Sequence, residues 1–216
     1  MADGPSESEI DVLEDPLAEA VLQIDIGKHP TFAEFDSLGQ GSAKRAINSL
    51  QAAIREGYLN VGKVKRILDF GAGRGGPTFV LTRVAKVIGA DVEAIEKSDV
   101  DARYIVTSGI LPANKVHIGN GVKFLKKQPG EEYDLITGFM FGPDDAHASL
   151  FQKMARASSR ALSPHGRLLI NSDMRTVAEI ERVAKVNHIE YSRIQGVGRD
   201  LTTLIFPQAE VAKLAY

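Results

Sequence analysis

The sequence predicts a doubly wound α/β domain with a seven-stranded, mostly parallel sheet, a C-terminal antiparallel hairpin and a helical N-terminal arm. From Lys65 onward, short apolar segments bounded by glycine, proline or polar residues alternate with segments of helical period. Such alternation, with loops of a few residues, predicts parallel strands connected by helices. The last two strand-like segments, residues 189–194 and 201–206, are joined by a linker too short for a parallel crossover. We therefore expect them to pair antiparallel.

The expected strands share a short apolar run that ends at a turn signal, and they lie at residues 67–70, 90–96, 115–118, 133–138, 167–170, 189–194 and 201–206. Residues 162–166 read as the turn that enters the fifth strand. Upstream of the sheet, residues 17–26 predict a short helix. Ser42 is expected to cap a longer helix that ends near Gly57, because serine oxygens accept from the first free N–H groups of a helix.

These elements divide the chain into three parts. Residues 1–16 combine acidic residues with Ser, Gly and Pro and predict a flexible N-terminus. Residues 17–62 are expected to form a helical arm, and its residues Phe32 and Phe35 are open to two interpretations, one of which is a lid that closes over a substrate. The alternative is an ordinary arm packed on the core. Residues 63–216 form the α/β domain.

Composition narrows the class of function. The chain has 216 residues, 26 Lys and Arg against 28 Asp and Glu, a net charge of −2 and no cysteine. The absence of a basic excess disfavours a nucleic-acid substrate, and the absence of thiols excludes disulfides and cysteine chemistry. No apolar run is long enough for a membrane span, and the acidic N-terminus does not resemble a signal peptide. We therefore expect a cytoplasmic protein.

The segment KRILDFGAGRGGPT, residues 65–78, predicts a buried strand, a glycine turn and a helix with Pro77 in its first turn. Glycines let the backbone turn tightly and let a ligand lie against it where a Cβ would clash. They fit two patterns: GxGxxG of dinucleotide sites, at residues 71, 73 and 76, and acidic-x-GxGxG, at residues 69, 71, 73 and 75. The segment therefore indicates a nucleotide site without choosing the nucleotide.

Four segments in order resemble the motifs of the class I S-adenosylmethionine (SAM)-dependent methyltransferases. They are DFGAGRG at residues 69–75, the acidic strand end at Glu96, EEYDLITGFMF at residues 131–141 and ALSPHGRLLI at residues 161–170. The last segment departs from the family's L-x-P-G-G-x-L-x-I pattern by His165 in place of the first glycine. The resemblance covers about residues 64–207. It implies a Rossmann-like fold, SAM as the cofactor and S-adenosyl-L-homocysteine (SAH) as its product.

The resemblance also implies which residues hold SAM. Asp69 would bear on the methionine ammonium, and residues 71–73 would present backbone groups to the methionine amine and carboxylate. Glu96 would accept from both ribose hydroxyls, because a carboxylate has two oxygens at about their separation. Asn120 stands where many family members have Asp, and its carbonyl can still accept from the adenine amino group. The full implied set is Asp69, Gly71, Ala72, Gly73, Gly75, Glu96, Lys97, Asn120, Gly121, Gly138 and Phe139.

The catalytic residues are less constrained by sequence. Aligning two bound reactants can lower a barrier by roughly 7–11 kcal/mol, so methyl transfer requires neither a metal nor a strong base. His147 is a candidate proton acceptor near neutral pH, with a solvent-facing helix residue as the alternative. Asp144 and Asp173 are further candidates, and Asp144 also reads as a helix cap. No metal is expected, because Gly138 stands about where a first carboxylate ligand would be needed.

The acceptor is expected to be a small molecule with a nucleophilic oxygen or nitrogen. One alternative is an RNA or protein methyltransferase that uses the basic residues Lys44, Arg45, Lys63, Lys65 and Arg66. Two others are a SAM-dependent aminocarboxypropyl transferase and an NAD-dependent oxidoreductase, and the C-terminal hairpin argues against the oxidoreductase. The sequence leaves the acceptor atom and the oligomeric state open.

Overall fold

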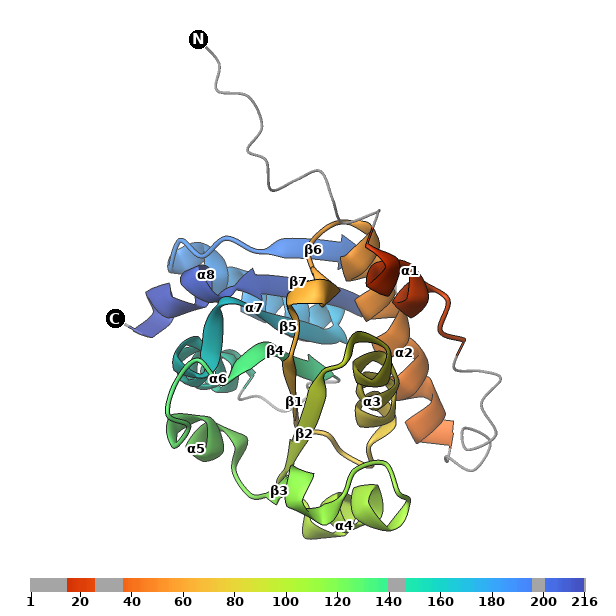
Figure 1. Cartoon of the computed structure of the whole chain (residues 1–216). Helices are drawn as coiled ribbons and strands as arrows, with labels where there is room; N and C mark the ends of the chain where they lie inside the picture. Colours follow the sequence, from red (N-terminus) through yellow and green to blue (C-terminus); the bar gives the residue numbers. More distant parts are fainter. Residues whose placement is uncertain (1–14, 26–36, 140–146, 196–200, 216) are drawn as a thin grey trace.

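The computed structural model describes residues 15–25, 37–139, 147–195 and 201–215, and it shows one sheet between two layers of helices (Figure 1). The sheet order is β3-β2-β1-β4-β5-β7-β6, with β7 antiparallel to both of its neighbours. The predicted seven-stranded, doubly wound fold with a closing antiparallel hairpin is therefore confirmed. The strands are β1 (Arg66–Phe70), β2 (Asp91–Glu96), β3 (Val116–Ile118), β4 (Tyr133–Phe139), β5 (Leu162–Asp173), β6 (Ser192–Gln195) and β7 (Leu201–Pro207).

The α-helices are α1 (Pro16–Leu22), α2 (Ser37–Arg55), α3 (Gly76–Ile88), α4 (Asp99–Thr107), α5 (Gly121–Lys126), α6 (His147–Ala161), α7 (Met174–Val186) and α8 (Gln208–Ala212). Short 3₁₀ turns are η3 (Val61–Lys63), η4 (Ala113–Lys115) and η5 (Lys213–Ala215). Helices α1 to α4 cover one face of the sheet and α5 to α8 cover the other (Figure 1). None of the helices in the described ranges combines the length and the apolar content needed to cross a bilayer.

Successive strand residues supply the two cores, because side chains alternate between the faces of a strand. In β1, Ile67 joins the core under α2 and α3, whereas Leu68 and Phe70 join the core under α5 to α8. Both faces of β1 are buried under helices, which explains why its sequence is a nearly continuous apolar run. Asp69 interrupts that run and lies on the α3 side.

The strand order reverses between β1 and β4, since β1, β2 and β3 progress outward in one direction and β4 returns to the other side of β1. In open α/β sheets, ligands bind outside the carboxyl ends of the strands at such a switch point. This topology places the glycine segment after β1 at the mouth of the expected crevice.

The prediction that Ser42 caps the arm helix was wrong, because α2 begins at Ser37. Gly39 and Gly41 favour a helix boundary locally, but a helical glycine costs only about 1 kcal/mol relative to alanine. The face of α2 that packs against α3 includes Ala43, Ala46, Ile47 and Leu50, all buried. This packing outweighs the local cost of the two glycines.

Two other boundaries differ from prediction. Residues 162–166, predicted as a turn, lie inside the longer strand β5, whose pairing with β4 jumps from Leu162 to Arg167. The would-be turn is therefore a bulge within a strand. Strand β6 begins at Ser192 rather than 189, because Ile189 N–H donates to Ala184 O (2.9 Å) and closes the end of α7.

Replacing Gly121 tests how tightly α5 is seated on the sheet. A Cβ at Gly121 would lie 2.4 Å from the Phe70 ring, so Gly121→Ala is expected to lower the free energy of unfolding by about 1–3 kcal/mol. Urea denaturation measures this change. The matched control is Gly41→Ala in α2, where a Cβ has no atom within 4 Å and a stabilisation of about 0.5–1 kcal/mol is expected. Equal stability of the two variants would contradict the close packing of α5 against Phe70.

Candidate functional site

The glycine loop between β1 and α3 has backbone conformations that favour glycine. Gly71, Gly73 and Gly75 have φ values of +74°, +53° and +85°, a region that residues with a Cβ rarely adopt. A Cβ on Gly75 would lie 2.9 Å from Ile110 and 3.0 Å from Ile105, so the protein itself fills that space. A Cβ on Gly71 or Gly73 would have no protein atom within 4 Å. The loop thus needs glycine at three positions and leaves open space at two of them.

The N–H groups of this loop donate within the protein. Gly71 N and Ala72 N donate to Ile95 O (2.9 and 3.3 Å), and Gly73 N donates to Glu96 Oε2 (2.7 Å). The ligand contacts predicted for residues 71–73 stay predictions. Carbonyl oxygens, which are the remaining backbone polar groups of Gly71 and Gly73, suit an ammonium better than a carboxylate.

Asp69, at the end of β1, is a buried carboxyl group with 1% of its surface exposed. Thr78 Oγ1 donates to its Oδ2 (2.6 Å), and Thr137 Oγ1 donates to its Oδ1 (3.2 Å). Desolvation raises the pKa of Asp69 to about 6, although the two hydroxyl hydrogen bonds oppose the rise. A cationic ligand group beside Asp69 would favour the ionised form. Sequence reasoning missed Thr78 and Thr137, and the only sequence signal was the GGPT that opens α3.

Glu96 lies at the end of β2, and backbone groups hold its carboxylate in place. Its Oε2 accepts from Gly73 N, and its Oε1 accepts from Ser98 N (2.8 Å). Each carboxylate oxygen retains a further lone pair, so the group can still accept two ligand hydroxyls. Ser98 in turn caps α4 by accepting from Asp101 N (3.3 Å). The exposed Lys97 lies between these two residues in the chain.

The turn after β3 lies next to Glu96, since Gly119 N donates to Glu96 O (2.8 Å). Asn120 Oδ1 accepts from Lys123 N (3.0 Å) and caps α5. The capping bond orients Asn120 and leaves one carbonyl lone pair for a ligand. The structure therefore brings the glycine loop, Glu96 and the start of α5 to the same edge of the sheet.

The predicted residues of β4 lie beside this edge. Gly138 and Phe139 end the strand, both are buried, and Phe139 belongs to the core under α2 and α3. They pair with Ile170 and Asn171 of β5. Phe139 is therefore a core residue at the carboxyl edge of the sheet.

The three predicted catalytic residues have different positions in the structure. Asp173 caps α7, where its carboxylate accepts from Thr176 N (2.9 Å) and Thr176 Oγ1 (3.1 Å). His147 begins α6. Asp144 and the lid residues Phe32 and Phe35 lie outside the described residues. Within the described ranges, no group of three or more His, Cys, Asp or Glu side chains could hold a metal ion.

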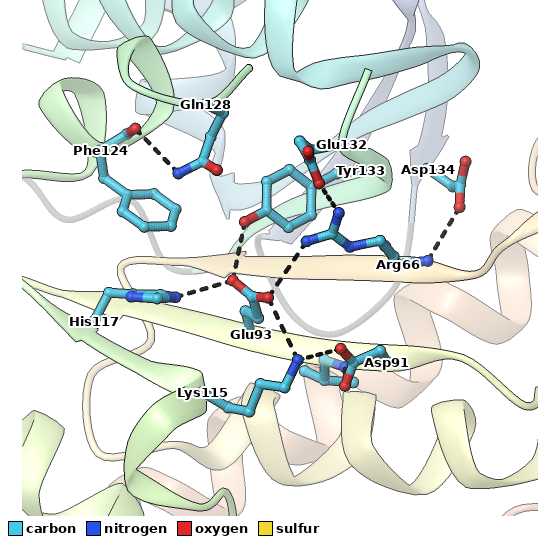
Figure 2. Close-up of polar contacts among 11 residues, drawn as sticks. Arg66, Asp91, Glu93, Lys115, His117, Phe124, Gln128, Glu132, Tyr133 and Asp134 are labelled. Atoms are coloured by element: carbon cyan, nitrogen blue, oxygen red, sulfur yellow. Dashed lines mark hydrogen bonds and ion pairs between the residues drawn. The ribbon is translucent and has the colours of Figure 1, made fainter. Parts of the chain in front are cut away.

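A second polar cluster lies away from this edge, under α5, and centres on Glu93 of β2 (Figure 2). Its carboxylate lies 2.9 Å from His117 Nε2, 3.1 Å from the Tyr133 hydroxyl, 3.4 Å from Arg66 and 3.5 Å from Lys115. Burial raises the pKa of Glu93, but hydrogen bonds from His117 and Tyr133 outweigh burial and hold the pKa below its ordinary value. All of these partners are within the protein, so the cluster is a structural network.

The network fastens the edge strand β3 and helix α5 to the sheet. The His117 ring lies 4.4 Å from the Phe124 ring of α5, centroid to centroid. Arg66 also pairs with Glu132 and stacks over the Tyr133 ring at 5.2 Å. Arg66 is thus paired with two acidic side chains of the fold, and the nucleic-acid alternative stays a prediction.

Comparison with known proteins identifies the fold more closely than the function. No family model matches the sequence. Spermidine synthase 2 of Hyoscyamus niger is 32% identical over 108 residues, which cover 47% of this chain and 35% of that protein. The chain therefore spans about a third of the length of this curated relative.

Solved structures resemble the chain over most of its length. PH0226 protein from Pyrococcus horikoshii OT3 has a TM-score of 0.58 at 14% identity and covers 84% of this chain and 96% of its own. Ribosomal protein L11 methylase from Lactobacillus delbrueckii subsp. bulgaricus has a TM-score of 0.55 at 16% identity, covering 77% and 80%. Mitomycin 7-O-methyltransferase MmcR has a TM-score of 0.52 at 15% identity, covering 79% and 55%. At these identities the likeness concerns the fold alone.

The buried Asp69 should make the unliganded protein less stable as pH rises. Its folded pKa of about 6 lies above the ordinary 3.8, so the folded state binds the proton more tightly and stability falls between about pH 4 and 6. Asp69→Asn is expected to remove this loss and to raise the free energy of unfolding at pH 7.5 by about 1–3 kcal/mol. Urea denaturation across this pH range measures the effect. Glu179→Gln, at an exposed ion pair with Arg182, is the control, and a destabilised Asp69→Asn would contradict the expectation.

Proposed function

We propose that this chain, which has the fold of the class I SAM-dependent methyltransferases, binds SAM at the carboxyl ends of β1, β2 and β4 and transfers its methyl group. The observation that carries the proposal is the position of two acidic residues, Asp69 and Glu96, next to one glycine loop. Buried Asp69 lies before the loop, and backbone-held Glu96 lies beside it, with open space at Gly71 and Gly73. Two acids at neighbouring strand ends suit a ligand with a cation at one end and a diol at the other.

The residues present fit the parts of SAM. Asp69 would face the methionine ammonium, since a buried carboxyl group is stabilised in its charged form by a cation. Glu96 would accept from the ribose hydroxyls, and Asn120 with Gly121 would border the adenine. Gly138 and Phe139 would lie near the sulfonium. The cofactor supplies an activated methyl group whose carbon–sulfur bond breaks as the acceptor's lone pair attacks.

The contribution of the protein to this chemistry is chiefly alignment. The loop and Glu96 are held by hydrogen bonds before any ligand arrives, so little ordering remains to oppose binding. The acceptor loses a proton when it is a hydroxyl or an ammonium, and we propose His147, at the start of α6, as the proton acceptor. The proposed acceptor is a small molecule, because the chain's net charge of −2 offers no general attraction for a polyanion.

Aminopropyl transfer is a second candidate, favoured by the partial likeness to spermidine synthase 2. In that reaction the donor would be the same sulfonium without its carboxylate. The glycine loop is compatible with it, because the N–H groups of residues 71–73 already donate within the protein. The choice between the two functions depends on whether the site requires a donor carboxylate.

The choice of donor is tested by calorimetry with SAM and decarboxylated SAM. The methyltransferase proposal expects SAM to bind at least about tenfold more tightly, a difference of about 1.4 kcal/mol. Preference for the decarboxylated donor would favour aminopropyl transfer. Failure of SAM, SAH and decarboxylated SAM to bind would contradict both functions, and NAD serves as the control for a dinucleotide site.

Replacing Glu96 tests the ribose contact. Removal of a charge-assisted hydrogen-bonding group is expected to weaken SAH binding by about 1.5–3 kcal/mol, or one to two decades in Kd. The variants are Glu96→Ala and Glu96→Gln, the second of which keeps one acceptor oxygen and should lose less affinity. Calorimetry gives the Kd values, and thermal unfolding checks that each variant folds. A folded Glu96→Ala protein with wild-type affinity would remove Glu96 from the site.

A further inference from the structure

Three buried hydroxyl and amide side chains join the N-terminal arm to the sheet. Asn171 of β5, Ser49 of α2 and Thr203 of β7 are each 0% exposed. Asn171 Nδ2 lies 3.2 Å from Ser49 Oγ and 3.0 Å from Thr203 Oγ1, and Thr203 Oγ1 lies 2.9 Å from Ser49 Oγ. Every pair in this triangle is within hydrogen-bond distance.

The number of protons available for these three contacts determines the orientation of the Asn171 amide. Three hydrogen bonds need three protons, and the NH₂ group supplies two while the Thr203 hydroxyl supplies the third. With the amide reversed, only the two hydroxyl protons would remain for three contacts, and both N–H groups would lose their partners. The orientation with Nδ2 toward Ser49 and Thr203 is therefore the favoured one.

This orientation leaves Asn171 Oδ1 buried and without a hydrogen-bond donor among the described residues. Buried polar atoms in folded proteins nearly always have a partner, so an unpaired carbonyl oxygen calls for a donor from outside the described chain. The two branches of an amide point apart. Because Nδ2 faces Thr203 on the β7 side, Oδ1 faces the other side of β5, where Phe139 of β4 is the register partner of Asn171.

The strand register places this oxygen relative to the cofactor site. Asp69 is level with Thr137 across β1 and β4, and Thr137 is level with Leu169 across β4 and β5. Asn171 lies two residues beyond Leu169, on the same face of the sheet and nearer the carboxyl edge. Its Oδ1 therefore lies on the β5 side of the proposed methionine position, where a methyl acceptor would approach.

We propose that Asn171 Oδ1 accepts a hydrogen bond from an N–H or O–H group of the acceptor substrate, so that the acceptor is an amine or an alcohol. The inference rests on the proposed function. It assigns Asn171 as a positioning residue on the acceptor side, held in place by Ser49 and Thr203. The side chain has no exposed surface in this structure, so the donor reaches it through a local opening and the bond then forms out of contact with water, where it is strongest.

The first experiment asks whether Oδ1 is unpaired in the free protein. Asn171→Leu has nearly the same volume and leaves Ser49 and Thr203 bonded to each other, so its Tm should equal or exceed that of the wild type. Thr203→Val is the matched control and should lower the Tm, because it leaves an Asn171 N–H unpaired. A fall of more than about 4 °C for Asn171→Leu would show that the fold itself requires the Asn171 amide and would overturn the inference.

The second experiment asks whether a ligand donor uses Oδ1. Butane-1,4-diamine and butane-1,4-diol are titrated into the protein with and without saturating SAH, with calorimetry as the readout. We expect at least one probe to bind the wild type, Asn171→Leu to weaken it by about tenfold or more, and the surface variant Glu179→Gln, at an exposed ion pair, to retain it. Asn171→Asp should tighten the diamine.

The outcomes separate this inference from the proposed function. Equal probe affinity for wild type and Asn171→Leu, or no binding of either probe to the wild type, overturns the role of Asn171. Failure of the wild type to bind SAH counts against the proposed function, whereas an SAH-binding protein that is indifferent to Asn171 loses only this inference.

Discussion

The burial of the Asp69 carboxyl group is the constraint on which the rest of the site depends. Its hydrogen bonds come from Thr78 of α3 and Thr137 of β4, so one side chain ties β1 to both elements that flank the strand-order switch. The two hydroxyls offset only part of the desolvation cost, and the pKa of Asp69 remains raised to about 6. Stability alone would favour a neutral residue here. An acid kept in such a position is typical of functional sites, where charge is held ready for a ligand.

The two polar clusters, the Glu93 network and the groups at the carboxyl edge of the sheet, differ in how much hydrogen-bonding capacity remains for a ligand. The Glu93 network is saturated by Arg66, Lys115, His117 and Tyr133, and it fastens β3 and α5 to the sheet (Figure 2). The groups at the carboxyl edge retain capacity: Glu96 keeps free lone pairs, and the space beside Gly71 and Gly73 is open. The saturated network positions the start of α5, and the unsaturated edge is the part able to meet a ligand.

Proteins of this fold differ in their acceptors, as the resembling structures show by their names: one is a methylase of ribosomal protein L11 and another a mitomycin 7-O-methyltransferase. What the comparisons show in common is the fold, which in this chain places the glycine loop at the point where the strand order reverses. The Ser49, Asn171 and Thr203 contacts link the arm to β5 and β7 in this chain.

The sequence by itself determined the strand and helix order, the antiparallel hairpin and the glycine loop, because apolar period, glycine spacing and linker length are local properties of a chain. It also identified Asp69 and Glu96 as acids at strand ends. Two boundaries in the structure differ from the sequence prediction: the start of α2 at Ser37 and the bulge that follows Leu162 in β5. At both places, packing against α3 or β4 outweighs the turn signals of glycine and proline.

Only the tertiary structure decided which side chains face one another. Thr137 meets Asp69 across 68 residues of sequence, and Thr203 meets Ser49 across 154. It also shows that Asp173 caps α7 and that Arg66 belongs to the Glu93 network, contacts that the sequence did not predict. No local pattern contains such pairings, because they depend on strand register and on which helix covers which face of the sheet.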